Sequence, residues 1–305
     1  MLRTIFTTAI ASTLLTLSTQ AETIWANGVS EIGGWYDANK TKDDDPDNNY
    51  HYPNDDTING ARTDDSMCYA AAAANILSWW QDRYELPEGV PTAVNGTDGK
   101  YSLTGNDIWS VFVQNSQIDG GLNTAQAMIW YLSGEAQYRT GDLYFPQTSG
   151  YFTDYIPNNS VLFNYSNSTD EHFIQKYNGT AENLIHILQD RKTPAALSLD
   201  ASHTITLWGA ELEDNNITHL YITDSDDYNN TTKLLTVKVV DSESDSVKFT
   251  LDNKDYIIST IYTINPEISD TWGLTRVTTP SIPEPATATL SLLALAGLAA
   301  RRRRR

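Results

Sequence analysis

Three residues of types that together perform nucleophilic catalysis lie in order along this chain. Cys68 is the only cysteine among 305 residues, and His203 and Asp224 follow it. A thiol nucleophile needs a base that takes its proton and a polar group that orients this base. The sequence therefore predicts Cys68 as a nucleophile, His203 as its base and Asp224 as the orienting carboxylate. A structural interpretation stays open, with Cys68 as a small buried apolar residue, His203 at a strand end and Asp224 in an ordinary turn.

The segment around Cys68 predicts a helix that is enclosed by protein. Residues 64–66, Asp-Asp-Ser, are of N-cap types, and an almost entirely apolar run follows as far as Trp80. We expect the helix to begin one or two residues before Cys68. A thiol in a first helical turn faces the N-terminal N–H groups and the positive end of the helix dipole, and both favour the thiolate. A chain with a single cysteine cannot form an internal disulfide, so Cys68 is predicted to be a free thiol.

Two predicted strands bring His203 and Asp224 together. Residues 204–212 and 217–223 are apolar, β-rich runs separated by a short polar turn. If they form a hairpin, His203 before the first strand and Asp224 after the second lie at the same end of it. His203 also follows Cys68 by 135 residues. This interval agrees with the ~130–150 residues that separate the cysteine from its partners in papain-like enzymes.

The other four histidines are less suited to act as the base. His51 is predicted in a polar loop, His172 on a polar helix and His219 at the start of a strand after an Asn-Asn turn. His186 lies near the apolar stripe of a predicted helix, where we expect a structural role.

The elements that must position these residues change type near the middle of the chain. Besides the helix after Cys68, helical periodicity predicts helices at residues 106–117, 123–133 and 180–190. The later β-rich runs are residues 195–199, 204–212, 217–223, 234–240, 247–251 and 257–264. We therefore predict an α+β fold, with an N-terminal helical half packed on a C-terminal antiparallel β-sheet.

Both ends of the chain have the features of sorting signals. Residues 1–21 combine Arg3, a short apolar region and a small-residue cleavage site, which predicts a secretory signal peptide. Residues 279–305 contain Pro-Glu-Pro, an apolar run and five arginines, and this order resembles a PEP-CTERM sorting signal. The resemblance implies export, processing by an exosortase-type enzyme, transient membrane association through the tail, and release or attachment at the cell surface. A plain tail anchor with a transmembrane helix is the alternative.

The part between the two ends, residues 22–278, is strongly acidic. The formal net charge of the chain is −19, and the two ends hold six basic residues and one acidic residue, which leaves about −24. This charge repels nucleic acid and anionic lipid, so neither is predicted as a partner. The aspartate-rich loop at residues 43–49 offers oxygen ligands that suit calcium. Because it lacks the central glycine and closing glutamate of an EF-hand, we expect a solvated loop and predict no metal or cofactor.

At the residues that suggest catalysis, the chain resembles the immunoglobulin-degrading Mac/IdeS-type cysteine endopeptidases, a divergent papain-fold group. The similarity spans about residues 30–275 and is weaker in the middle third. The stretches that carry it, in family order, are Gly34-Trp35-Tyr36-Asp37 with Lys40-Thr41, Asp64-Asp65-Ser66-Met67-Cys68 with Asn75-Ile76-Leu77-Ser78-Trp79-Trp80, His203 with Leu207-Trp208-Gly209-Ala210, and Tyr221-Ile222-Thr223-Asp224-Ser225-Asp226. The resemblance implies a papain-like peptidase domain over residues 22–278.

The resemblance also implies individual roles in the site. Cys68 would be the nucleophile, His203 the general base and acid, and Asp224 the residue that orients His203. Lys40 would correspond to the oxyanion-stabilising lysine of the family, with Asp226 holding it. The interval between Lys40 and Cys68 is longer here than in the family, which leaves Lys42 as an alternative.

We therefore expect a secreted or cell-surface cysteine endopeptidase that hydrolyses a protein or peptide through a thioester acyl-enzyme. The best-known substrate of the family, immunoglobulin G, is not carried over, because the sequence does not identify the groove residues that set specificity. Two alternatives stay open. One is a catalytically inactive papain-like surface binding protein, and the other is a thiol acyltransferase or transglutaminase-like enzyme, which uses the same three residue types.

Overall fold

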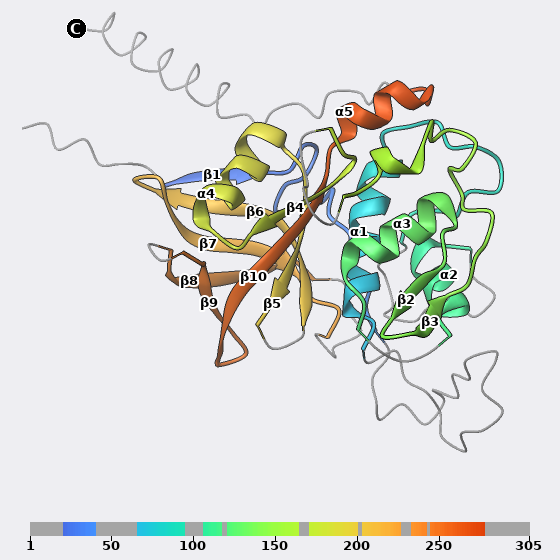
Figure 1. Ribbon diagram of the computed structural model, residues 1–305. Helices are drawn as coiled ribbons and strands as arrows, with labels where there is room; N and C mark the ends of the chain where they lie inside the picture. Colours follow the sequence, from blue (N-terminus) through green and yellow to red (C-terminus); the bar gives the residue numbers. More distant parts are fainter. Residues whose placement is uncertain are drawn as a thin grey trace, which may run out of the picture.

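A closed antiparallel β-barrel and a group of short helices lie side by side in the computed structural model (Figure 1). The structure describes residues 21–40, 66–94, 106–117, 121–164, 171–200, 203–226, 233–242 and 245–277. The predicted signal peptide up to residue 20, Lys42, the acidic loop at 43–49, the N-cap candidates Asp64 and Asp65, and the tail at 279–305 lie outside these residues.

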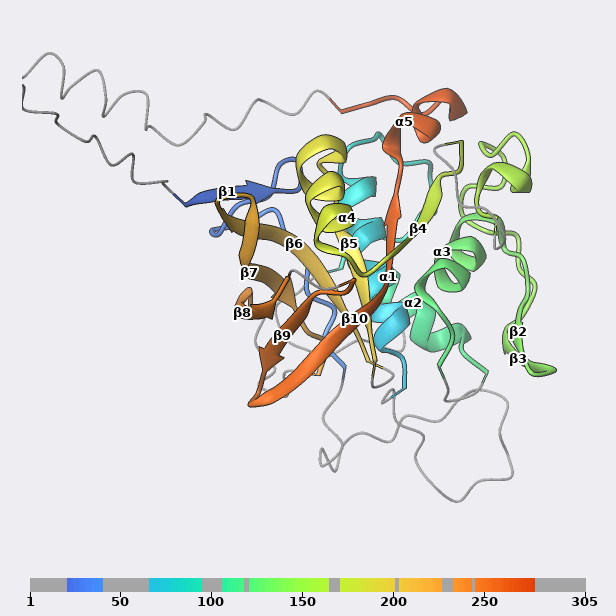
Figure 2. The same cartoon turned by 60° about the vertical axis from the view of Figure 1, so that its left-hand side comes forward.

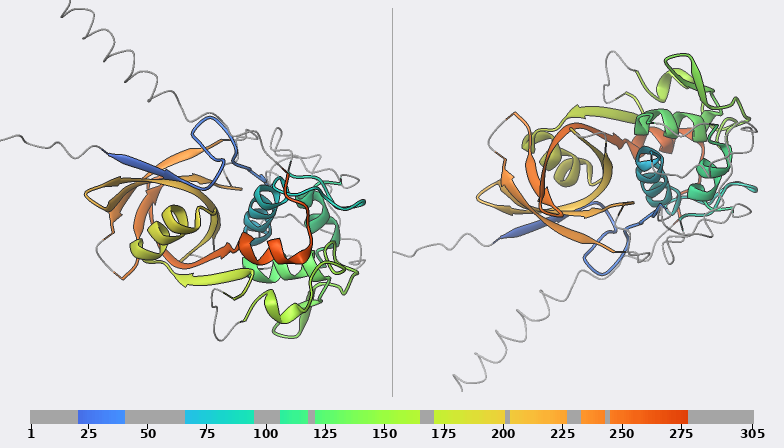
Figure 3. Two further views of the ribbon diagram at one scale, coloured as in Figure 1. Left: turned by 90° about the horizontal axis from the view of Figure 1, so that it is seen from above. Right: turned by 90° about the horizontal axis from the view of Figure 1, so that it is seen from below.

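Six strands form the barrel, in the order β6-β5-β10-β9-β8-β7, and pairing of β7 with β6 closes it. Viewed along its length, the barrel is a ring (Figure 3). The strands are β5 (Ala195–Leu199), β6 (Thr204–Glu213), β7 (Asn216–Thr223), β8 (Leu235–Asp241), β9 (Lys248–Leu251) and β10 (Lys254–Ile264). Two further strands pair with barrel strands: β1 (Glu22–Trp25) pairs with β6, and β4 (Ile174–Asn178) pairs with β10.

The prediction of a papain-like fold, with a helical half packed on an antiparallel sheet, is wrong at this point. The strands were predicted nearly as they are found, but they curve into a closed barrel of six strands beside five short helices. The physical reason lies in the two faces of the strands. The side chains of Leu197 and Leu207 belong to the barrel core. Those of Ala196 and Trp208, the adjacent residues in the same strands, pack with the helices instead. A run of residues that is apolar on both faces predicts a buried strand. It does not show whether each face is covered by helices or by the opposite wall of a barrel.

Two hairpins with tight turns help to close the barrel. Asp214 and Asn215 join β6 to β7, and Asp252 and Asn253 join β9 to β10, all with positive φ between 50° and 64°. Two successive residues with positive φ match the right-handed twist of the flanking strands, and Asp and Asn tolerate this conformation. Side chains of α4 (Ala181–Ile185) and the following turn of π-helix (His186–Arg191) join the barrel core at one end.

The remaining helices form a second core around the longest of them. This helix is α1 (Cys68–Gln81), in which every residue is buried. The others are α2 (Ile108–Asn115), α3 (Thr124–Ser133) and α5 (Pro266–Ser269), with short 3-10 turns at Asn159–Val161 and Asp270–Trp272 and a hairpin of β2 (Gln137–Arg139) and β3 (Asp142–Phe145). Figure 2 shows α1 between the barrel and the helices α2 and α3.

The local signals for helix ends are confirmed for α3 but not for α1. Asn123 and Gln126 form a reciprocal capping box at the start of α3, and Gly134 ends it in the left-handed conformation. Helix α1 begins at Cys68 itself, after the predicted point, and its N-cap Met67 provides no side-chain hydrogen bond. Among the helices in the part of the chain that the structure describes, none has the length and apolar character needed to cross a bilayer.

Gly209 in β6 is a position where the barrel leaves no room for a side chain. It pairs with Trp25 of β1. A Cβ atom at this position would lie 2.4 Å from the Trp25 ring and 2.8 Å from the carbonyl oxygen of Ile24. We therefore expect Gly209→Ala to lower the free energy of unfolding by about 1–3 kcal/mol, because the edge strand must move.

Urea unfolding followed by tryptophan fluorescence measures this loss. Gly33→Ala is the matched control, because a Cβ there meets nothing within 4 Å. Equal unfolding midpoints for the two variants would show that β1 does not pack on β6 in this way.

Candidate active site

Cys68 lies at the seam between the helices and the barrel. It is the first residue of α1, which packs against β5 and β6, and the residue is 7% exposed. The thiol therefore stands at the positive end of α1, although the helix begins later than the one or two residues before Cys68 that the sequence predicts. It is a free cysteine.

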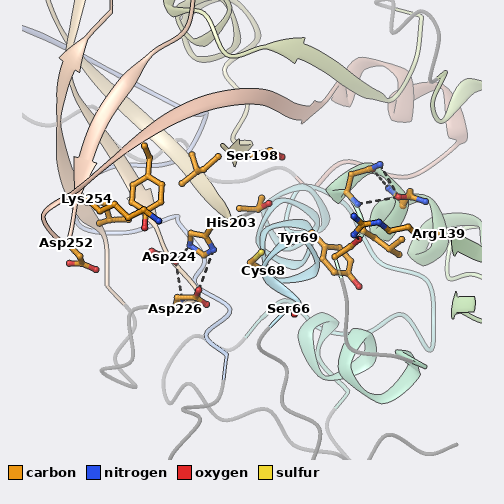
Figure 4. A pocket seen from close by; sticks show the side chains of 18 residues that line it. Ser66, Cys68, Tyr69, Arg139, Ser198, His203, Asp224, Asp226, Asp252 and Lys254 are labelled. Atoms are coloured by element: carbon orange, nitrogen blue, oxygen red, sulfur yellow. Dashed lines mark hydrogen bonds and ion pairs between the residues drawn. The ribbon is translucent and has the colours of Figure 1, made fainter. Parts of the chain in front are cut away.

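His203 and Asp224 lie at the same end of the β6–β7 hairpin and are hydrogen-bonded to each other. Nε2 of His203 is 2.7 Å from Oδ1 of Asp224, whose side chain is almost fully buried. The same carboxylate oxygen accepts the backbone N–H of Asp226 at 3.0 Å. The Cys68 thiol lies beside the imidazole (Figure 4), and each group shifts the pKa of the other. The cysteine, the histidine and the aspartate thus form one continuous chain of contacts.

Lys40 and Asp226 complete the cluster from a second direction. The Lys40 ammonium is 2.5 Å from Oδ1 of Asp226, and Oδ2 of Asp226 is 3.4 Å from Nδ1 of His203. The Lys40 side chain is only 7% exposed, so this cation is held inside the protein. Its backbone N–H donates to the carbonyl oxygen of Ser225 at 3.0 Å, which fixes the segment next to the turn after β7.

The electrostatics of this cluster favour a thiolate beside an imidazolium. Burial of Cys68 opposes its ionisation. The hydrogen bond to His203 and the charges of His203 and Lys40 outweigh this effect, against a smaller opposing charge on Asp226, so the pKa of the thiol is lowered from 9.0. Burial also lowers the pKa of His203, but the hydrogen bonds to Asp224 and Cys68 and the charges of Asp224 and Asp226 raise it to about 10.

One buried amide connects the three parts of the chain that supply these groups. Asn75, in the second turn of α1, accepts the Ala38 N–H at 2.8 Å and donates to the hydroxyls of Thr206 in β6 at 3.0 Å and Thr223 in β7 at 3.4 Å. Asn75 is 2% exposed. The helix that bears Cys68, the hairpin that bears His203 and the segment that leads to Lys40 are therefore fixed to one side chain.

The Thr223 hydroxyl extends this network, because it uses its full hydrogen-bonding capacity. Besides the Asn75 amide, it accepts the indole N–H of Trp208 at 2.9 Å and donates to the carbonyl oxygen of Tyr36 at 3.0 Å. A buried polar network that is fully satisfied specifies one arrangement of the elements it joins.

A groove of about 830 Å³ opens over Cys68 and runs between the helices and the barrel (Figure 4). Tyr69 and Arg139 line its helical side, and Leu199, Leu251 and Tyr256 line its barrel side. The groove has walls from two separate cores and the reactive thiol between them. This geometry suits an extended chain that crosses the thiol.

Three members of the cluster also have ligand atoms that could hold a metal ion. His203, Asp224 and Asp226 offer ligand atoms within 4.8 Å of one another, the one such group among the described residues. Asp226 already pairs with the Lys40 ammonium, and Asp224 with the His203 imidazole. A metal ion bound here would have to displace the Lys40 cation and the proton on His203.

The structure brings together all five residues that the sequence singled out: Cys68, His203, Asp224, Lys40 and Asp226. Lys42, the alternative to Lys40, lies outside the described residues. His186 and His219 lie elsewhere, next to Asp190 and Glu211 respectively, and His172 precedes β4 rather than lying on a helix.

Sequence reasoning missed Asn75 as the residue that connects these elements. A usable signal was present, since Asn75 is a polar break within a helix that is otherwise apolar on all sides.

Comparison with known protein families adds an independent finding. The family model described as Mac 1 matches residues 127–257. The Mac 1 region includes His203, Asp224 and Asp226, whereas Cys68 and Lys40 precede it. This match confirms the resemblance and is consistent with a peptidase. No curated protein matches the chain.

The C-terminal segment is identified in the same way. Residues 281–305 match the PEP-CTERM protein-sorting motif, which confirms the second resemblance. The motif indicates export, with the Mac 1 region at the cell surface or outside the cell, and it implies processing by an exosortase-type enzyme.

Removal of the Asn75 amide tests its connecting role. Asn75→Ala leaves a backbone N–H and two hydroxyls without this partner in a buried place, so we expect the free energy of unfolding to fall by about 2–4 kcal/mol. Urea unfolding measures the loss. Asn115→Ala is the control, because the Asn115 side chain bonds only to the carbonyl of Val111 within its own helix. A loss no larger than that of the control would contradict the role given to Asn75.

Proposed function

We propose that this protein is a cysteine endopeptidase that hydrolyses peptide bonds of an extracellular protein. The observation that carries the proposal is the chain of contacts from Cys68 through His203 to Asp224, at a helix N-terminus and in a groove. A thiolate needs no further base before it attacks, and the imidazolium beside it is the acid that the leaving group needs.

The reaction follows from the proton positions. The Cys68 thiolate attacks the carbonyl carbon of the scissile bond, and His203 gives its proton to the amine as the carbon–nitrogen bond breaks. A thioester remains on Cys68. His203, now neutral, takes a proton from a water molecule that attacks the thioester, and the acid product leaves as Cys68 returns to the thiolate beside a reprotonated His203. Each proton that leaves His203 is thus returned to it within one cycle.

Lys40 is assigned to the oxyanion of each tetrahedral intermediate, together with the backbone N–H of Cys68. The ammonium is buried, and its charge acts on the thiol. A fixed cation in a site that excludes water stabilises developing negative charge strongly. Asp226 holds Lys40 and also faces Nδ1 of His203, so it keeps the cation and the acid in fixed positions.

The domain limits and the substrate class complete the proposal. Residues 22–278 form the peptidase part, after a signal peptide at 1–21 and before the sorting segment at 279–305, which associates transiently with the membrane before processing. Because the sorting motif indicates export, the substrates are polypeptides outside the cell.

The pH dependence of thiol alkylation tests the ion pair. The pKa of Cys68 is lowered from 9.0, so the thiolate persists at pH values at which an ordinary cysteine is protonated. It is lost only as the pH falls through the lowered pKa. We expect rapid alkylation by iodoacetamide at neutral pH, and a His203→Ala variant that requires a higher pH. A labelling rate that rises only near pH 9 in both proteins would exclude a stabilised thiolate and favour a binding protein.

Cleavage of casein by the full-length protein tests the activity. Cys68→Ala should abolish cleavage, because no other residue of the cluster can form the thioester. The products should carry new free carboxylates. If an added amine is instead incorporated at the acyl group, the enzyme is an acyltransferase. Cleavage by Cys68→Ala that equals the wild type would refute the mechanism.

Replacement of the buried cation separates its role from that of the triad. Lys40→Met should lower kcat by about 10²-fold, as expected for loss of one oxyanion contact. The variant should still form the thioester slowly, and a Lys248→Met variant on the barrel surface should keep wild-type kcat. An unchanged kcat in Lys40→Met would remove Lys40 from the oxyanion site.

A further inference from the structure

Arg139 is a cation of the groove that the proposed reaction does not use. It is the last residue of β2 and pairs with Asp142 across the β2–β3 hairpin. Its guanidinium donates to the backbone carbonyl of Gly121, on the segment that leads into α3. Among the residues that the structure describes, no carboxylate oxygen lies within 4.0 Å of a guanidinium nitrogen of Arg139, the limit for an ion pair. The backbone contact therefore orients Arg139 without neutralising it.

We call the part of the groove around Arg139 its helical end and the part around Lys254 its barrel end, and these two ends differ in charge. Arg139 and Lys254 lie on opposite sides of Cys68 (Figure 4). Lys254 lies over the ring of Tyr256 at 4.6 Å, and the carboxylate of Asp252 lines the same end. Among the described residues that line the groove, the barrel end thus combines a cation with an anion, whereas the helical end has a cation alone.

The other polar groups near Arg139 do not offset its charge. Asn123 and Gln126 also line the helical end, but both are neutral and hydrogen-bond to each other in the capping box of α3. The aspartates of the groove floor, Asp224 and Asp226, contact His203 and Lys40 instead. Within the part of the chain that the structure describes, an isolated positive site therefore remains at the helical end, in a protein whose body carries about −24.

We propose that Arg139 selects substrates with an acidic side chain on the helical side of the scissile bond. The planar guanidinium matches the two oxygens of a carboxylate, and the Gly121 contact orients it before the substrate arrives. This inference rests on the proposed endopeptidase function and deepens it by naming a substrate class. Arg139 acts on specificity and takes no part in the chemical steps.

Peptides that differ at single positions test the proposal. A cleaved site is first located in casein with the full-length protein, and a quenched fluorescent peptide of that sequence is made with Glu, Gln or Lys at each position around the scissile bond. At one position we expect kcat/KM for Glu to exceed that for Gln by about three- to fivefold, the size of an exposed ion pair. Arg139→Gln should remove this preference, and Arg139→Glu should reverse it in favour of Lys.

Lys254→Gln is the matched control, because it removes the cation at the other end of the groove. It should keep the preference for Glu at the position that Arg139 reads. Alkylation of Cys68 should be unchanged in the Arg139 variants, which shows that the cluster is intact. Cleavage with no charge preference, or a preference that survives Arg139→Glu, would overturn this inference alone. Absence of any cleavage by the wild type would overturn the endopeptidase proposal and this inference with it.

Discussion

The pairing of a Cys68 thiolate with a His203 imidazolium is the interaction on which the proposed site depends, and three further charged groups surround it. A thiolate and an imidazolium at a largely buried seam are costly to remove from water. Asp224 compensates the imidazolium, Lys40 favours the thiolate, and Asp226 joins Lys40 to His203. Loss of any one of these groups leaves a partner with an uncompensated charge.

This requirement explains why the site lies between two cores rather than within one. The cysteine comes from a buried helix, the histidine and the aspartates from one end of a barrel hairpin, and the lysine from an extended segment near the N-terminus. Helix α1 packs in the core of the helices, and β6 and β7 contribute to the core of the barrel. The network around Asn75 and Thr223 fixes their relative positions, and the open side of the seam becomes the groove. Because one wall of the groove comes from the helical part and the other from the barrel, the two walls present different side chains to a substrate.

The candidate site could be predicted from the sequence because its signals are local. Each of the three residues lies at the end of a predicted element: the cysteine follows N-cap residue types, the histidine precedes an apolar strand, and the aspartate follows the next strand. The short polar turn between the two strands predicts that they pair as a hairpin. The closed barrel could not be predicted, because closure depends on β10 pairing with both β5 and β9 and on β7 pairing with both β6 and β8. Strands such as residues 204–212 are apolar on both faces, and their sequence does not distinguish a barrel wall from a sheet covered by helices. The prediction of Lys40 as a site residue depended on the family resemblance, because no local sequence pattern links Lys40 to Cys68.

The most direct test of the central claim is the protonation state of His203, measured by nitrogen NMR of the imidazole as a function of pH. The account predicts that both ring nitrogens carry a proton at neutral pH and that the proton is lost only near the pKa of about 10, with a lower value in Cys68→Ala. A neutral imidazole at pH 7.5 that titrates near 6.5 in both proteins would contradict the ion pair, and with it the mechanism.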